Sequence, residues 1–226
     1  MIRWNKVYRG AGVLMLVIAL CGCSGAKATV DEVMEEIKST QVSEKDIAEL
    51  ELDDVILRVG ERDVDYGDVL FYIYQAKQKY EKELTSSVWD VTMEDGDSFE
   101  EYAKKELLRE MTEVEVICTE AQTEGVKLTE EEQAEAENKA SAFLDSVTEE
   151  DKELYGFVED RVKDIYVNHA LANKMYHVVT SESDTSLKDK AFEDAYSKWS
   201  EDIEIHMSVE LWKSIGIQTV KGAQRE

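Results

Sequence analysis

Histidines are the first residues to test for chemistry, because imidazole is the commonest metal ligand and general base near neutral pH. The chain of 226 residues has three of them. His169 and His177 lie eight residues apart in one predicted helix, which separates them by about 80° around its axis. They therefore do not form the i, i+4 ligand pair of a helical zinc site. His206 falls in a predicted strand and faces away from Ile205. We expect surface or internally hydrogen-bonded histidines and no metal.

Carboxylates are the next candidates, since Asp and Glu together account for 51 residues. General acid–base catalysis requires a pocket that shifts the pKa of a carboxyl group. The acidic runs at 130–132 and 149–151 stand instead at predicted helix starts, where capping and the helix dipole explain them. The sequence contains no phosphate-binding glycine loop and no nucleophile elbow. We therefore expect a binding protein without a cofactor.

The cysteines lead to a different kind of chemistry, because two of the three follow a secretion-like N-terminus. The first nine residues contain three basic side chains and no acid, and residues 10–20 form an apolar run. This order is typical of a signal peptide, and the run is short for a transmembrane helix. An uncleaved membrane anchor is the alternative.

Residues 20–23, Leu-Cys-Gly-Cys, resemble the lipobox of bacterial lipoproteins. The resemblance implies that residues 1–22 are removed and that lipid is attached to Cys23. The chain would then be held at the extracytoplasmic face of a bacterial membrane. Ordinary signal cleavage beside two incidental cysteines is the alternative. Cys118 lies on the apolar stripe of a predicted helix, which indicates a buried, inert thiol.

The formal net charge of −25 limits the possible partners. Nucleic acid is not expected, because its phosphates require a basic surface. Contact with anionic lipid is disfavoured too, so the acyl chains would hold a folded part that stands away from the membrane. The charge serves either solubility or the attraction of cationic clients.

The predicted fold is mainly α, with about five to six helices and a small antiparallel sheet of two or three strands. Residues 23–51 are expected to form a tether with a short helix, and residues 216–226 a disordered tail. Residues 55–59 and 203–207 both alternate with the period of a strand. We expect these two segments to pair and to join the N- and C-terminal parts of the domain.

The helices are predicted from apolar residues spaced three and four apart and from capping residues at their starts. Asp65, Ser98, Thr129 and Thr148 are the expected caps, and Ser208 is expected to cap a short terminal turn. Gly125 and Gly156 are expected to end helical segments. Long helices follow over residues 66–84, 98–124, 157–179 and 187–201, with a further helix from 129.

Several stretches, taken in order, resemble the extracytoplasmic foldases of the SurA and PrsA type. They are VGERDVDYGDVLFYIYQAKQKYE at 59–81, VWD at 88–90, DSFEEYAKKELL at 97–108, EGVKLTEEE at 124–132, ALANKMY at 170–176 and AFEDAYSKWSEDIEIHMSVELW at 191–212. The resemblance covers residues 52–215. It implies one chaperone domain, related in shape to the substrate-cradling part of trigger factor, whose partners are unfolded or newly secreted polypeptides.

In that family a parvulin peptidyl-prolyl isomerase domain is commonly inserted before the last helix. Here only residues 180–186 are expected to connect the corresponding helices, so no parvulin domain fits. Isomerase activity by family inheritance is the enzymatic alternative, and an accessory lipoprotein of an envelope or export complex is another. A solute-binding lipoprotein is not expected, because the alternating β–α pattern is absent.

A chaperone surface needs aromatic and methionine side chains that adapt to many client sequences. For each such residue, burial in the core is the alternative. The candidates for client binding are Phe71, Tyr74, Trp89, Met93, Tyr102, Met111, Met175 and Tyr176.

Overall fold

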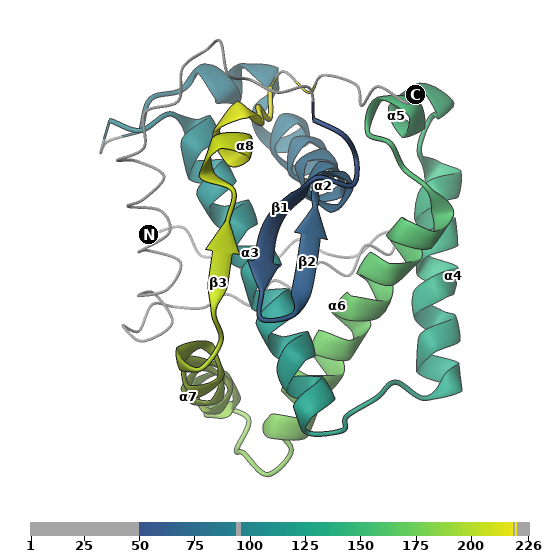
Figure 1. The fold of residues 1–226 in the computed structure, drawn as a ribbon, viewed down its shortest axis with the longest axis vertical. Coiled ribbons are helices and arrows are strands. Elements are labelled where there is room, and N and C mark those ends of the chain that lie inside the picture. The colour runs from purple at the N-terminus through teal and green to yellow at the C-terminus, as the bar shows by residue number, and fades with distance from the viewer. Residues whose placement is uncertain (1–49, 94–95, 219, 221–226) are drawn as a thin grey trace.

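The computed structural model describes residues 50–93, 96–218 and 220. Strands β1 (Val55–Val59) and β2 (Arg62–Asp65) come first, followed by helix α2 (Tyr66–Leu84), the 3-10 helix η2 (Ser86–Asp90) and helix α3 (Phe99–Thr123). Then follow α4 (Glu130–Ser146), α5 (Glu149–Leu154), α6 (Glu159–Val179), α7 (Lys188–Glu201), β3 (Ile205–Met207) and α8 (Val209–Ser214) (Figure 1). The prediction of a mainly helical chain with a small antiparallel sheet is confirmed.

The expected signal peptide, the lipid attachment at Cys23 and most of the tether lie outside the described residues. Within the described part of the chain, no helix is both long enough and apolar enough to span a bilayer.

The sheet has the strand order β2-β1-β3, with both pairs antiparallel. Leu57 lies opposite Met207 and Val59 opposite Ile205, so the predicted pairing of the two distant segments is confirmed. The register between β1 and β2 shifts between Val55 and Leu57. Ile56 and Leu57 are both fully buried, because β1 is the central strand and is contacted by α2, α3 and α8.

Capping explains where most helices begin. Reciprocal capping boxes join Asp65 to Asp68, Ser98 to Glu101 and Thr129 to Glu132. Thr148 accepts a hydrogen bond from the amide of Asp151 at the start of α5. Ser208 precedes α8, but its side chain makes no capping hydrogen bond, so that part of the prediction is wrong. Helix α6 begins at Glu159, two residues later than the apolar pattern predicted.

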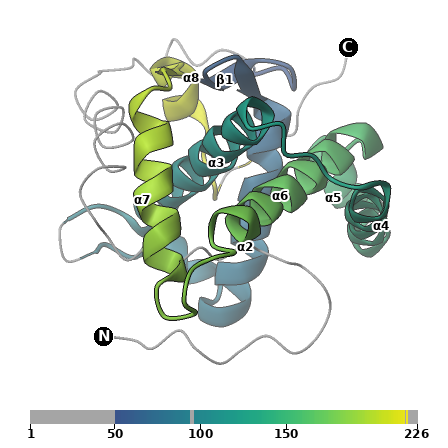
Figure 2. The same ribbon diagram turned by 90° about the horizontal axis from the view of Figure 1, so that it is seen from below.

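Helices α7, α3, α6 and α4 follow one another in a row, as Figure 2 shows. Helix α3 is inside this row and also contacts α2 and the sheet, so residues 111–118 are buried on every side of the helix. Ile217 is fully buried as well, and its amide donates to Glu100. The folded unit therefore includes Ile217, which the sequence had assigned to the tail.

Helices α4, α5 and α6 form a unit, residues 130–179, that we call the arm. It is attached to α2 through an aromatic cluster. The ring of Phe143 lies 5.3 Å from that of Phe71 and 5.5 Å from that of Phe157, with further contacts to Tyr74 and Tyr166. These ring contacts, edge-to-face except for the tilted one with Tyr166, add to the burial of apolar area and fix the position of α4.

Candidate functional site

Five of the eight candidate client-binding residues are buried in the core. They are Phe71, Tyr74, Trp89, Met111 and Met175. The reason is that α2, η2, α3 and α6 pack against one another and against neighbouring helices, so these side chains are enclosed between elements. In this structure these five residues cannot contact a client.

The three remaining candidates, Met93, Tyr102 and Tyr176, are partly or well exposed. Tyr102 is 40% exposed and packs beside Phe99. Tyr176 packs against Phe192 of α7 and donates a hydrogen bond to Asp189. Met93 and Tyr102 flank the start of α3, whereas Tyr176 lies on α6 against α7, so the predicted set does not form one surface.

The structure has a hollow between α4 and α6, and none of the eight candidate client-binding residues lines it. It has a volume of about 580 Å³, and we call it the arm groove. Small side chains at Ala136 and Ala170 leave this space unfilled. The groove is lined by Leu128, Glu132, Glu135, Ala136, Lys139, Tyr166, His169, Ala170, Asn173, Lys174, His177, Val178 and Ser181.

Two ion pairs are formed by residues that line the arm groove. Lys174 of α6 lies 2.5 Å from Glu132 of α4 and so links the two helices across it. Lys139 pairs with Glu135 at 2.7 Å, along α4. The arm groove thus combines an apolar lining with charged groups of both signs, which suits an occupant with apolar side chains and a polar backbone.

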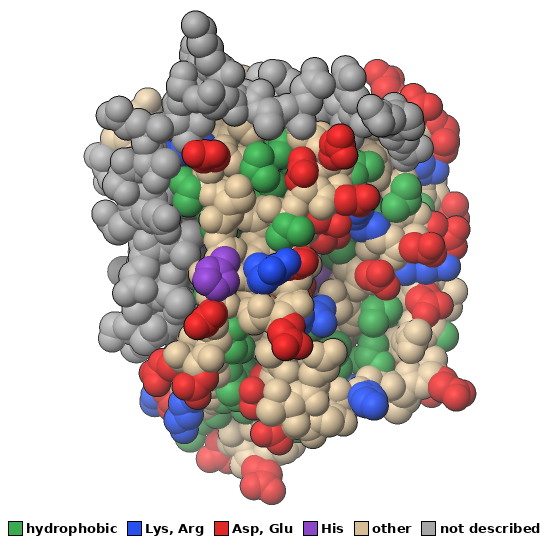
Figure 3. Space-filling model, in the orientation of Figure 1, with side chains coloured by type: hydrophobic (Ala, Val, Ile, Leu, Met, Phe, Trp, Pro, Cys, Tyr) green, Lys and Arg blue, Asp and Glu red, His purple; other side chains and the backbone are tan. Residues whose placement is uncertain are grey.

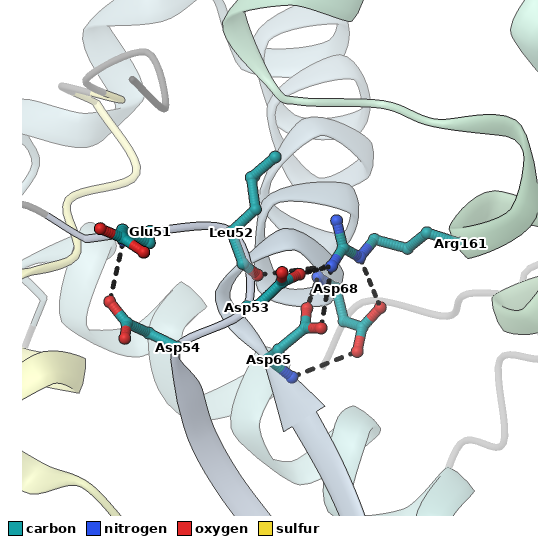
Figure 4. Close-up of polar contacts among 7 residues, drawn as sticks. All are labelled: Glu51, Leu52, Asp53, Asp54, Asp65, Asp68 and Arg161. Atoms are coloured by element: carbon teal, nitrogen blue, oxygen red, sulfur yellow. Dashed lines mark hydrogen bonds and ion pairs between the residues drawn. The ribbon is translucent and has the colours of Figure 1, made fainter. Parts of the chain in front are cut away.

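A second hollow, the acidic pocket, lies where α6 meets α2 and β2, with a volume of about 560 Å³. Arg161 reaches from α6 into a group of carboxylates there (Figure 4). Its Nη2 atom is 2.9 Å from Asp53 Oδ1 and 2.9 Å from Asp65 Oδ2, and its Nε atom is 3.6 Å from Asp68 Oδ1. The pocket is lined by Leu52, Asp53, Asp63, Val64, Asp65, Asp68, Tyr72, Glu115, Val158, Arg161, Asp164, Ile165 and Asn168.

Gly67 permits the close approach of Arg161 to α2. A Cβ atom at this position would lie 2.4 Å from Nη1 of Arg161. The sequence predicted Asp65 only as a helix cap and did not single out Arg161. Its partner Asp65 is 96 residues away in sequence, and no local pattern connects two such positions.

The electrostatics of the acidic pocket are dominated by burial. Burial raises the pKa of Asp68 to about 7, and the nearby Asp65 adds to this rise while Arg161 opposes it. Burial also raises the pKa of Glu115, against the opposing effect of its ion-pair partner Arg62. A carboxyl group that titrates near neutral pH is a feature of catalytic acids. A nucleophile or base poised to act with it would complete such a site.

The two side chains nearest to the role of nucleophile or base, Tyr72 and His169, have pKa values shifted so that each stays in its neutral form. Tyr72 and His169 are hydrogen-bonded at 3.0 Å between Oη and Nε2, and they line the acidic pocket and the arm groove respectively. Burial lowers the pKa of His169 to about 4 and raises that of the Tyr72 phenol. Both side chains are therefore neutral at pH 7. Among the described residues, no group of His, Cys, Asp and Glu is arranged to hold a metal ion.

Cys118 is a buried thiol whose sulfur donates to the carbonyl oxygen of Asn168, as its predicted burial implied. Burial raises its pKa to about 12. We expect native Cys118 to react with iodoacetamide at pH 8 at least about a thousand times more slowly than a free cysteine. Peptide mass spectrometry of the labelled full chain measures this rate at Cys118 alone. The same chain in 8 M urea is the control, and fast native labelling would contradict the prediction.

Comparison of the chain with protein-family models, curated proteins and solved structures finds no match. The resemblance to SurA- and PrsA-type foldases rests on the sequence stretches quoted above, and the geometry of the two hollows has to support a function by itself.

Proposed function

We propose that this protein is a chaperone, anchored through Cys23 to the extracytoplasmic face of a bacterial membrane, that binds unfolded or newly secreted polypeptides. The observation that supports this function best is the arm groove, an open hollow of about 580 Å³ between α4 and α6. A hollow of this size accepts a few side chains of an extended segment. A folded partner would need a broader surface.

The lining of the arm groove suits weak binding of many sequences. Tyr166 and Val178 offer apolar contact, while Ala136 and Ala170 leave room for client side chains of different sizes. The ion-paired Glu132 and Lys174 offer an acceptor and a donor to the polar backbone of a client. Such contacts are individually weak, so a bound segment would dissociate quickly.

The charge of the protein supports the same function. Acidic side chains are spread over the face shown in Figure 3 and gather along the edge formed by α4 and α5. The strongly negative net charge, −25 for the full sequence and more negative once residues 1–22 are removed, opposes the aggregation of a complex with a client.

This chaperone would act without an isomerase domain. Helix α6 ends at Val179 and α7 begins at Lys188, so eight residues connect them. The connection consists of tight turns, with the amide of Leu187 bonded to the carbonyl of Asp184. We expect no acceleration of cis–trans isomerisation in a proline-containing peptide.

Ala170→Glu tests the arm groove as the client site. The substitution places a carboxylate among the apolar groups that a client would cover, and desolvating it would weaken client binding by at least about tenfold. Fluorescence anisotropy with a labelled unfolded polypeptide measures the affinity, and light scattering measures the suppression of aggregation of a denatured client.

Ala134→Glu is the matched control, because Ala134 is an exposed residue of α4 that does not line the groove. This variant should bind as the unsubstituted chain does. Failure of the unsubstituted chain to suppress aggregation at stoichiometric excess would refute the chaperone function. Equal binding by both variants would instead place the client site elsewhere.

A further inference from the structure

Glu113 is a buried carboxyl group that the proposed function does not use. It lies in the enclosed middle of α3 and is 8% exposed. Its Oε1 atom has no hydrogen-bond partner among the described residues. The next acidic residue of the helix, Glu115, is buried as well, but it is paired with Arg62. Leaving a buried carboxylate oxygen unpaired is costly, so Glu113 is an exception that requires an explanation.

A second carboxyl group lies one turn earlier. Burial raises the pKa of Glu110 to about 7 and that of Glu113 to about 8, and the charge of Glu110 contributes to the second shift. The ionisable groups that interact with the two come from three helices. They are Glu106 and Arg109 of α3, Lys79, Tyr72 and Tyr80 of α2, and Tyr196 of α7.

The neighbouring cations do not neutralise Glu113. Arg109 is bound to Glu106 at 2.6 Å. Lys79 lowers the pKa of Glu110, yet burial outweighs it. On the side of α7, Tyr196 is 4% exposed, and the charge of Glu113 adds to the rise in the pKa of its phenol. Ionising both carboxyl groups would place two like charges one turn apart on α3, and the buried one, Glu113, acts on Tyr196 of α7.

We propose that the contact between α3 and α7 is a pH-sensitive joint, which is closed while Glu110 and Glu113 carry their protons and loosens when they lose them. Helix α7 is the element that can yield, because it stands at the end of the row of helices and only the three-residue strand β3 follows it into the sheet. Helix α3 is held by α2, α6 and the sheet. Loosening would expose Phe192 and Tyr196, which are buried in the closed form.

The direction of the effect follows from the raised pKa values. Below about pH 4.5 both groups are protonated in the folded and the unfolded chain, and their contribution to stability is complete. Between about pH 4.5 and 8 the unfolded chain releases protons that the folded chain retains, so the free energy of unfolding falls as the pH rises. The inference does not depend on the chaperone function.

Hydrogen exchange of the full chain at pH 5.5 and pH 8.5 tests the joint. We expect the protection factors of residues 188–201 to fall at least about tenfold between the two pH values in the unsubstituted chain, and less than about threefold in Glu113→Gln, which cannot ionise. Glu201→Gln is the charge-matched control at an exposed site of α7, and it should behave as the unsubstituted chain does.

Two outcomes would overturn the joint. One is an equal fall in the unsubstituted chain and in Glu113→Gln. The other is a fall of the same size across α4 and α6, which would indicate general destabilisation. If Glu113→Gln does not fold, the side-chain carboxyl ¹³C shift of Glu113 in the unsubstituted chain decides the matter. Titration near pH 8 supports the joint, and titration near pH 4.5 refutes it.

Discussion

Arg161→Ala should lower the free energy of unfolding by about 3–5 kcal/mol at pH 8, because it removes the cation from a partly buried group of carboxylates. The Arg161 side chain is 14% exposed, and those of Asp65 and Asp68 are 24% and 23% exposed. Without the guanidinium, these two carboxylates would face each other and the remaining acids of the pocket. The substitution also removes a contact that holds α6 to the start of α2.

The effect of Arg161→Ala should depend on pH. The pKa of Asp68 is about 7, so this group is largely protonated at pH 5.5 and charged at pH 8. At pH 5.5 fewer carboxylates around Arg161 are ionised, so removing its positive charge should cost less stability than at pH 8. Urea unfolding at both pH values, followed by circular dichroism, measures the difference.

Lys163→Ala is the control for Arg161. Lys163 is also on α6 and pairs with Glu159 at 2.6 Å, but this pair lies at the surface. Water solvates both of its charges, so the urea midpoint should hardly change. An Arg161 variant as stable as the Lys163 variant would show that the buried cluster contributes nothing to the fold.

Phe143→Ala should cost about 3–5 kcal/mol, since Phe143 is the residue of α4 at the centre of the aromatic cluster. Its ring is 7% exposed and contacts rings from α2 and from the α6 side of the arm. Helix α4 packs mainly on α6. Loss of the ring should therefore release α4 before the rest of the domain unfolds.

Hydrogen exchange resolves this local effect. In Phe143→Ala, residues 130–146 should lose protection while residues 99–123 keep most of theirs. The affinity for a client should also fall in Phe143→Ala, because α4 forms one wall of the arm groove. Leu187→Ala, at an apolar residue that is 53% exposed, is the control and should change neither property. Uniform loss of protection in Phe143→Ala would show that the arm is not a separate unit of stability.

The sequence predicts well those features that a few neighbouring residues determine. The capping boxes of Ser98 and Thr129 place the starts of α3 and α4 correctly, because each device satisfies backbone donors within one turn. The pairing of β1 with β3 could also be predicted, since both segments alternate and a short strand needs a partner.

Features that depend on how helices cover one another could not be predicted. Met111 and Glu113 lie on different sides of α3, and an amphipathic pattern would leave one of them in water. The structure buries both, because neighbouring elements enclose the middle of this helix. Burial against neighbouring elements also removed five of the eight proposed client contacts. The residues that line the arm groove were missed, because the groove results from small side chains on two helices whose relative position the sequence does not specify.

The central position of β1 in the sheet determines when the sheet can be completed during synthesis. Its neighbour β2 is made immediately after it, but β3 (Ile205–Met207) follows only after helices α2 to α7. A chain that emerges N-terminus first therefore has an open edge on β1 until residues 205–207 have been synthesised. The arm, whose contacts are closer in sequence, can form earlier. Completion of the sheet therefore comes after the arm has been made, and a chain terminated before β3 would carry an unpaired edge by which quality-control proteases could distinguish it from the folded protein.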